Sequence, residues 1–216
     1  MNPTALAHLR KRCPVMRRLI REHEPCMIAP DTRRSPFEAL VSAVAHQQLH
    51  GKAAETILGR FRALFAPARF PLPHQLATVT DDALRACGFS RAKTAAIRDI
   101  AEKTLSGVVP TSRAIARLSD DEIITRLTTV RGVGRWTVEM LLIFKLGRPD
   151  VLPADDFGIR NGLRVAFKLP ALPSPKEVLA HGEPWRPHAT TAAWYLWRAA
   201  DAAPPRQATA VKAVRT

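Results

Sequence analysis

The sequence predicts an all-α protein with about nine to eleven helices. Apolar residues recur at helical spacing along most of the chain, and Ser or Thr residues followed by acidic ones mark several helix starts. No stretch shows the alternation of apolar and polar residues that is typical of a strand. A length of 216 residues, of which 46% are hydrophobic, allows one domain or two small lobes with an ample core.

Three helices are predicted in the first third of the chain. They lie within residues 1–34, from Ser35 to about residue 47, and from Lys52 to Phe65. The second begins most clearly, because Ser35 can cap it and a proline follows in its first turn. Glu38 stands three residues after the serine, so we expect the pair to form a capping box.

The remaining helices are predicted from their start and stop signals. Thr80, Ser90 and Ser119 are expected to cap three of them, and Glu122 completes a second capping box with Ser119. In order, we expect helices over 81–87 and 91–106, from Ser119, from about Arg135, over 157–169, after Pro175 and over 188–200. Residues 206–216 are predicted to form a basic flexible tail.

The composition predicts a polyanionic partner. Lys and Arg number 33 against 19 acidic residues, a net charge of +14, which is typical of nucleic-acid binders. A generic basic surface or a ribosomal or histone-like binder would fit the charge equally well. Cys13, Cys26 and Cys87 match no disulfide, zinc or iron–sulfur pattern. We see no signal peptide and no membrane-spanning run, so we expect a soluble intracellular protein with no membrane partner.

A glycine turn precedes a very apolar helix in the middle of the chain. Gly132 and Gly134 flank Val133, which permits a tight turn and leaves backbone N–H groups uncovered. The helix that starts near Arg135 adds its own unpaired N–H groups and the positive end of its dipole. These features suit a phosphate group, although for a lone Gly-x-Gly turn an ordinary helix connection is the commoner arrangement.

Two adjacent carboxylates, Asp155 and Asp156, stand at the start of the helix that follows. One carboxylate at a helix start can cap backbone N–H groups while its neighbour points into a cleft. From the pair alone, capping by both residues is the commoner arrangement.

Two neighbouring segments together carry a family resemblance. GVGRWTVEMLLIF at 132–144, followed by LPADDFGIRNGL at 152–163, resembles the helix-hairpin-helix and catalytic-aspartate signature of the HhH-GPD base-excision DNA glycosylases. The alkylbase type, DNA-3-methyladenine glycosylase II, is the most similar. AVAHQQLHGKAA at 43–54 and PWRPHATTAAWYLWR at 184–198 resemble its DNA-probing helix end and its C-terminal helix. The similarity runs from about residue 35 to residue 200.

The resemblance implies a fold of two helical lobes with a central cleft, within one catalytic domain over 1–205. One lobe would comprise about 36–150, and the other 1–35 plus 151–205.

The resemblance also implies the roles of several side chains. Breaking the bond between base and sugar builds positive charge on the sugar, which a fixed carboxylate stabilises, and that carboxylate is expected to be Asp156. Trp136 stands where glycosylases with lyase activity carry a Schiff-base lysine, so we expect a monofunctional hydrolase. Trp136 and Trp197 are expected to face the extruded base, and Met140 replaces a pocket tyrosine. For both tryptophans, plain core packing is the alternative.

DNA contacts and a cation site are implied in the same way. The hairpin contact is expected from Arg131, Gly132, Val133, Gly134 and Arg135. Gln48 is expected to plug the hole left by the flipped base, and His50 to touch the minor groove. Main-chain carbonyls of Thr128, Val130 and Val133 match positions that bind a monovalent cation in relatives. No other cofactor and no iron–sulfur cluster are expected.

The function expected is removal of alkylated purines from duplex DNA, chiefly 3-methyladenine, with 7-methylguanine as a second candidate. Two alternatives remain: a non-catalytic helix-hairpin-helix DNA-binding protein, and a glycosylase of the same superfamily for oxidised or mismatched bases. We expect a monomer, which would be cytoplasmic and nucleoid-associated in a bacterium or nuclear in a eukaryote.

Overall fold

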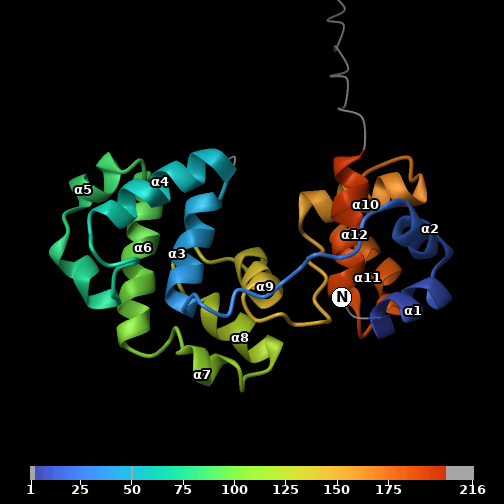
Figure 1. Cartoon of the computed structure of the whole chain (residues 1–216), viewed down its shortest axis with the longest axis horizontal. Coiled ribbons are helices and arrows are strands. Elements are labelled where there is room, and N and C mark those ends of the chain that lie inside the picture. The colour runs from blue at the N-terminus through green and yellow to red at the C-terminus, as the bar shows by residue number, and fades with distance from the viewer. Residues whose placement is uncertain (1–2, 50, 203–216) are drawn as a thin grey trace, which may run out of the picture. The chain divides into compact units, whose positions relative to one another are not determined.

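The computed structural model describes residues 3–49 and 51–202, and these residues form twelve α-helices, two 3₁₀ helices and no strand (Figure 1). The predicted all-α class is therefore confirmed. The predicted tail at 206–216 lies outside the described residues. Over residues 3–49 and 51–202, none of the helices combines the length and hydropathy that a membrane-spanning segment needs.

The chain divides into two compact units. Among the described residues, the terminal unit is drawn from 3–26, 154–186 and 191–202, and the central unit from 27–49, 51–153 and 187–190. Most of the chain's middle therefore folds as a single body, and both ends of the chain contribute to the other.

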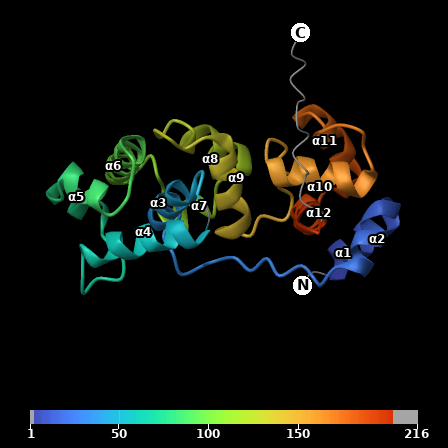
Figure 2. The same cartoon turned by 90° about the horizontal axis from the view of Figure 1, so that it is seen from above.

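The central unit is built around one buried helix. Its elements are α3 (Pro36–His46), α4 (Gly51–Ala63), η1 (Pro73–Thr78), α5 (Asp81–Ala86), α6 (Arg91–Leu105), α7 (Ser112–Ile115), α8 (Asp120–Leu127) and α9 (Arg135–Phe144). Helix α3 lies between α6 and α9 and contacts both (Figures 1 and 2). Leu40, Val41 and Val44 of α3 are fully buried, as the helical spacing of its apolar residues predicts.

The terminal unit contains the first and last helices of the chain. They are α1 (Pro3–Arg12), α2 (Pro14–Glu22), α10 (Phe157–Phe167), α11 (Pro175–Gly182), η2 (Glu183–Trp185) and most of α12 (Ala189–Asp201). Leu9, Met16 and Trp185 are fully buried within it.

The prediction of about nine to eleven helices was too low. A single helix was expected before Ser35, but Pro14 ends α1, because proline lacks a backbone N–H and its ring clashes with the preceding turn. The short elements η1 and α7 were also missed, because segments of six and four residues are too short for an apolar repeat to show.

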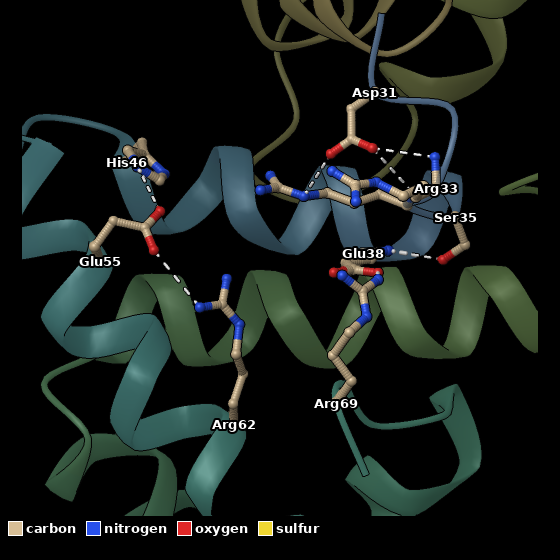
Figure 3. Close-up of polar contacts among 9 residues, drawn as sticks. Asp31, Arg33, Ser35, Glu38, His46, Glu55, Arg62 and Arg69 are labelled. Carbon is tan, nitrogen blue, oxygen red and sulfur yellow. Dashed lines mark hydrogen bonds and ion pairs between the residues drawn. The ribbon is translucent and has the colours of Figure 1, made fainter.

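Helix starts were predicted well, with one correction. The Ser119 and Glu122 capping box forms, with Ser119 N–H donating to Glu122 Oε2 over 2.7 Å. Ser35 Oγ also accepts from Glu38 N–H at 3.1 Å as expected. The Glu38 carboxylate, however, is buried and pairs with Arg69 at 2.8 Å instead of returning to Ser35 (Figure 3). A buried carboxylate needs a charged or hydrogen-bonding partner, and Arg69 supplies it.

Candidate functional site

The glycine turn between α8 and α9 requires glycine at one position and leaves space at another. Gly132 has a φ of +74°, and a Cβ added there would lie 2.8 Å from Ala96 Cβ on α6. Both its backbone angle and its close approach to α6 therefore exclude larger residues. Gly134 precedes the first turn of α9, and a Cβ there would meet nothing within 4 Å. Gly134 therefore leaves the N-terminus of α9 accessible.

Two of the turn's backbone N–H groups already donate hydrogen bonds within the protein, so fewer N–H groups remain for the predicted phosphate. Arg131 N–H donates to Asp99 Oδ2 at 2.7 Å, and Val133 N–H donates to Val130 O at 3.1 Å. Within the described part of the chain, the N–H groups of Gly132 and Gly134 make no hydrogen bond, and both glycines are exposed. The N–H groups that remain for the predicted phosphate are therefore those of Gly132 and Gly134 and the first N–H groups of α9.

The side chains of the predicted hairpin contact divide between surface and core. Arg131 and Arg135 are exposed, whereas Val133 is buried and anchors the turn. Arg135 Nε lies 2.9 Å from the buried Glu139 Oε1, one turn further along α9. Its guanidinium is thereby held along the helix, whereas among the described residues the Arg131 side chain forms no ion pair.

The predicted DNA plug lies directly after α3. Gln48 is exposed and has a φ of +56°, a left-handed conformation that is uncommon outside glycine. His50, predicted to touch the minor groove, lies outside the described residues. The preceding Gln47 donates from Nε2 to Gly132 O at 3.0 Å and to Thr137 Oγ1 at 3.2 Å. The segment that carries Gln48 is thus tied to the glycine turn.

Trp136 and Met140 line a pocket of about 410 Å³ in the central unit. This volume falls within the range of about 300–1,000 Å³ that is usual for small-ligand sites. The Trp136 side chain remains 37% exposed, so part of its indole is accessible to solvent. The pocket also includes polar residues that the sequence did not single out: Asp31, Arg34, Ser42 and His46.

The polar residues of this pocket are held in fixed pairs. The Asp31 carboxylate accepts from the N–H groups of Arg33 and Arg34, and it lies 3.0 Å from Arg34 Nε (Figure 3). Burial works to raise the pKa of Asp31, but these hydrogen bonds and the Arg34 charge lower the pKa overall. His46 Nε2 lies 3.4 Å from Glu55 Oε1 on α4. A charged carboxylate and a neighbouring guanidinium therefore sit at the pocket edge.

Asp156, in the terminal unit, is held by two hydrogen bonds to one oxygen. It is half-buried and caps α10, with Oδ1 accepting from Ile159 N–H at 2.8 Å. The same Oδ1 accepts from the indole N–H of Trp197 on α12 at 2.9 Å. The residue predicted to be catalytic therefore also caps the helix, so the expected division between one capping aspartate and a neighbour that does not cap is corrected. Asp156 itself is the cap, and Asp155 is exposed.

Gly158 makes this arrangement possible, and sequence reasoning missed it. A Cβ at Gly158 would lie 2.8 Å from Trp197 Cδ1 and 3.0 Å from Asp156 Oδ1. Only glycine leaves room for the indole to reach the carboxylate. The glycine stands two residues after Asp156, but its contact with Trp197 spans 39 positions of the sequence and gave no local signal.

The three predicted base-pocket residues belong to two different units. Trp136 and Met140 face a common pocket in the central unit, whereas Trp197 belongs to the terminal unit, where its indole N–H is committed to Asp156. Trp197 therefore positions a carboxylate, a task that the sequence did not indicate.

The predicted cation ligands lie where α8 ends. The last carbonyls of a helix lack helical partners and carry the negative end of its dipole, which favours a cation. Among the described residues, no group of three His, Cys, Asp or Glu side chains is placed to hold a metal ion. A cation at Thr128, Val130 and Val133 would therefore be held by main-chain oxygens, and Val130 O already accepts the Val133 N–H.

A helix, a glycine turn, a second helix and then a helix capped by an aspartate define a helix-hairpin-helix protein. The family model of HhH-GPD superfamily base excision DNA repair proteins matches residues 41–187, which include the Gln48 loop, the turn and Asp156. The chain belongs to this superfamily.

Named relatives agree with this assignment. DNA-3-methyladenine glycosylase 1 of Schizosaccharomyces pombe is 49% identical over 166 residues, covering 77% of this chain and 73% of the relative. An alkylbase DNA glycosidase-like protein of the same yeast is 35% identical, covering 83% of this chain and 85% of the relative.

Solved structures show the same fold. The 3-methyladenine DNA glycosylase of Schizosaccharomyces pombe in complex with abasic DNA aligns with a TM-score of 0.82 and 44% identity, over 90% of this chain and 95% of that one. A DNA-3-methyladenine glycosidase of Bacillus halodurans aligns with a TM-score of 0.79 and 32% identity, over 93% and 90% of the two chains.

Proposed function

We propose that this protein is a monofunctional DNA glycosylase that hydrolyses the N-glycosidic bond of alkylated purines in duplex DNA. We take 3-methyladenine as its chief substrate and 7-methylguanine as the second. The observation that carries the proposal is the Asp156 carboxylate, held at a helix start by Ile159 N–H and the Trp197 indole. The names of its relatives, which are 3-methyladenine glycosylases, support the substrate class.

In the proposed reaction, the bond between C1′ and the purine nitrogen breaks and its electron pair leaves with the base. An alkylated purine is already cationic, so the departing base becomes neutral while positive charge builds on the sugar. The Asp156 carboxylate stabilises that charge. Water then bonds to C1′, and Asp156 accepts its proton before passing it to solvent. The products are an abasic sugar and a free base.

Trp136 supports hydrolysis by water rather than a covalent intermediate. A Schiff-base mechanism needs an amine nucleophile in the site, and the residue two positions after Gly134 is a tryptophan. The exposed part of its indole offers an electron-rich face, which attracts a cationic ring through cation–π interaction. We therefore assign Trp136 and Met140 to the wall that receives the extruded base.

The remaining surfaces fit duplex DNA as the partner. The N–H groups of Gly132 and Gly134, together with the start of α9, are proposed to hold one phosphate. Arg131 adds a side-chain contact, and Gln48 is proposed to fill the gap left by the flipped base. A monovalent cation on the carbonyls after α8 would neutralise part of the phosphate charge, and no step of the reaction passes through it.

Release of free bases from methylated duplex DNA, identified by chromatography, tests the proposal. We expect wild-type protein to release 3-methyladenine, and Asp156→Asn to be slower by at least about a hundredfold, because the neutral amide cannot balance the sugar's charge. The affinity of Asp156→Asn for duplex DNA should remain within about twofold, since phosphate contacts are unchanged. An Asp156→Asn variant that excises at the wild-type rate would contradict the catalytic assignment, and an inactive wild type would contradict the proposed function.

A further inference from the structure

The C-terminal end of α3 is held by two side chains whose task is otherwise unassigned. Lys93, in the first turn of α6, donates from Nζ to Ala45 O at 2.9 Å and to Gln47 O at 2.7 Å. Gln47 in turn donates from its amide to Gly132 O and Thr137 Oγ1, in the turn and α9. These bonds join α3, α6 and the hairpin at one point, directly before Gln48.

Lys93 is an unusual cation for this surface. No carboxylate of the described residues forms an ion pair with it, and its compensation comes from two main-chain oxygens at the end of a helix. Such oxygens lack helical partners and favour a positive charge. Burial lowers the pKa of Lys93, so its ammonium is partly withdrawn from water. An ammonium used this way restrains a backbone segment rather than offering its charge to solvent.

The segment that Lys93 restrains contains the left-handed Gln48. A non-glycine residue at a φ of +56° is strained, and such a conformation persists only where its surroundings hold it. Gln48 is itself exposed, so the hold must come from its neighbours. Gln47 and Lys93 supply it from the side facing the hairpin, and Leu49 N–H donates back to His46 O at 3.2 Å.

We propose that Gln47 and Lys93 are positioning residues, which lock the end of α3 onto the hairpin so that Gln48 enters the duplex where the extruded base was. This proposal rests on the proposed function. The lock would fix the offset between the phosphate held by the turn and the base pair probed by Gln48. A damaged base is then extruded one fixed step from the held phosphate.

The experiment uses a duplex with a tetrahydrofuran abasic analogue beside 2-aminopurine, whose fluorescence reports disturbed base stacking. Wild type, Gln48→Ala, Gln47→Met and Lys93→Met are compared for this signal, for duplex affinity, for melting temperature and for single-turnover excision from methylated duplex. The matched control is Arg126→Met, because Arg126 also donates to two main-chain carbonyls of the central unit, those of Gly107 and Val108.

We expect Gln47→Met and Lys93→Met to show the same defects as Gln48→Ala. Their fluorescence change and excision rate should fall by about tenfold, while duplex affinity stays within about twofold, because phosphate binding is separate from plugging. Arg126→Met should lower the melting temperature about as much as Gln47→Met and Lys93→Met do. It should nevertheless keep the wild-type fluorescence change. A wild-type fluorescence change in Gln47→Met and Lys93→Met would overturn the proposal. An equal loss of the fluorescence change in Arg126→Met would overturn it as well. A wild type that gives the signal but releases no base would instead defeat the proposed function.

Discussion

The Oδ1 atom of Asp156 accepts from two donors that approach from different elements, Ile159 N–H on α10 and the Trp197 indole on α12. Two such bonds fix the rotation of a short side chain. The carboxylate is then ordered when the protein folds, so that substrate binding does not have to order it. Gly158 keeps the path between indole and carboxylate open.

Replacing Gly158 with alanine should therefore damage both catalysis and stability. The new Cβ would lie 2.8 Å from Trp197 Cδ1, which must shift and release Asp156. We expect the single-turnover excision rate to fall by at least about tenfold and the free energy of unfolding by about 1–3 kcal/mol, a typical cost of overpacking. Urea denaturation and base release from methylated duplex measure the two effects.

Gly59→Ala is the matched control for this prediction. Gly59 lies inside α4, where a Cβ would meet nothing within 4 Å. Alanine is the better helix former, so this change should stabilise the protein by about 0.5–1 kcal/mol and leave excision unchanged. If Gly158→Ala behaved like Gly59→Ala, the steric account of the Asp156 site would be wrong.

At the scale of elements, the glycine turn depends on its fit against α6. Gly132→Ala adds a Cβ 2.8 Å from Ala96 Cβ and places alanine at a φ of +74°. We expect a loss of about 2–4 kcal/mol in the free energy of unfolding, from strain and overpacking together. Gly134→Ala, with open space around it, should change stability by less than about 0.5 kcal/mol. Ala96→Gly alone should cost about 0.5–1 kcal/mol, because glycine is a poor helix former. In the Ala96→Gly background, Gly132→Ala should cost less than it does in wild type, and an equal cost in both backgrounds would show that the clash is unimportant.

The start of α8 gives a pH-dependent prediction. Hydrogen bonds from the backbone and hydroxyl of Ser119 lower the pKa of Glu122 below its ordinary value of 4.5. A lowered folded-state pKa contributes stability that is present above the ordinary pKa and is lost as the pH falls through the folded-state pKa. Glu122→Gln should therefore lower the melting temperature at about pH 7, and the difference from wild type should vanish in acid.

Glu102→Gln is the control for the capping box. Among the described residues, the Glu102 side chain makes no hydrogen bond or ion pair, so its substitution should leave the melting temperature at about pH 7 close to that of wild type. A difference between wild type and Glu122→Gln that persisted unchanged in acid would show that the Glu122 charge contributes nothing.

At the scale of the whole molecule, local features were predictable and distant contacts were not. The caps at Ser35 and Ser119 follow from residues three apart, so their sequence pattern was sufficient. The place of Asp156 at the start of a helix was also predicted, from the motif that contains it. Its partner Trp197 stands 41 residues away, and the partners of Gln47 stand 85 and 90 residues away. Such pairings depend on how helices pack, which no single segment encodes.

The charge of +14 leads to a prediction for binding to duplex DNA. Each phosphate contact releases bound counterions, so the logarithm of affinity should fall linearly with the logarithm of salt concentration, with a slope of about −0.9 for each phosphate. We expect a slope steeper than about −3, because the basic surface can reach several phosphates. Arg131→Gln should reduce the slope by about one. Titration by fluorescence anisotropy measures both, and a flat dependence would contradict phosphate binding.

The turn between α8 and α9 is fastened at two points, by Asp99 to the Arg131 N–H and by Gln47 to the Gly132 carbonyl. The backbone of this turn is therefore preorganised before any nucleic acid binds. Association then costs little conformational entropy, because the turn does not have to be ordered. A protein that searches a genome for rare lesions must sample and release undamaged sites many times. A prefolded turn lets each brief encounter begin and end without local refolding, which favours rapid scanning over tight residence.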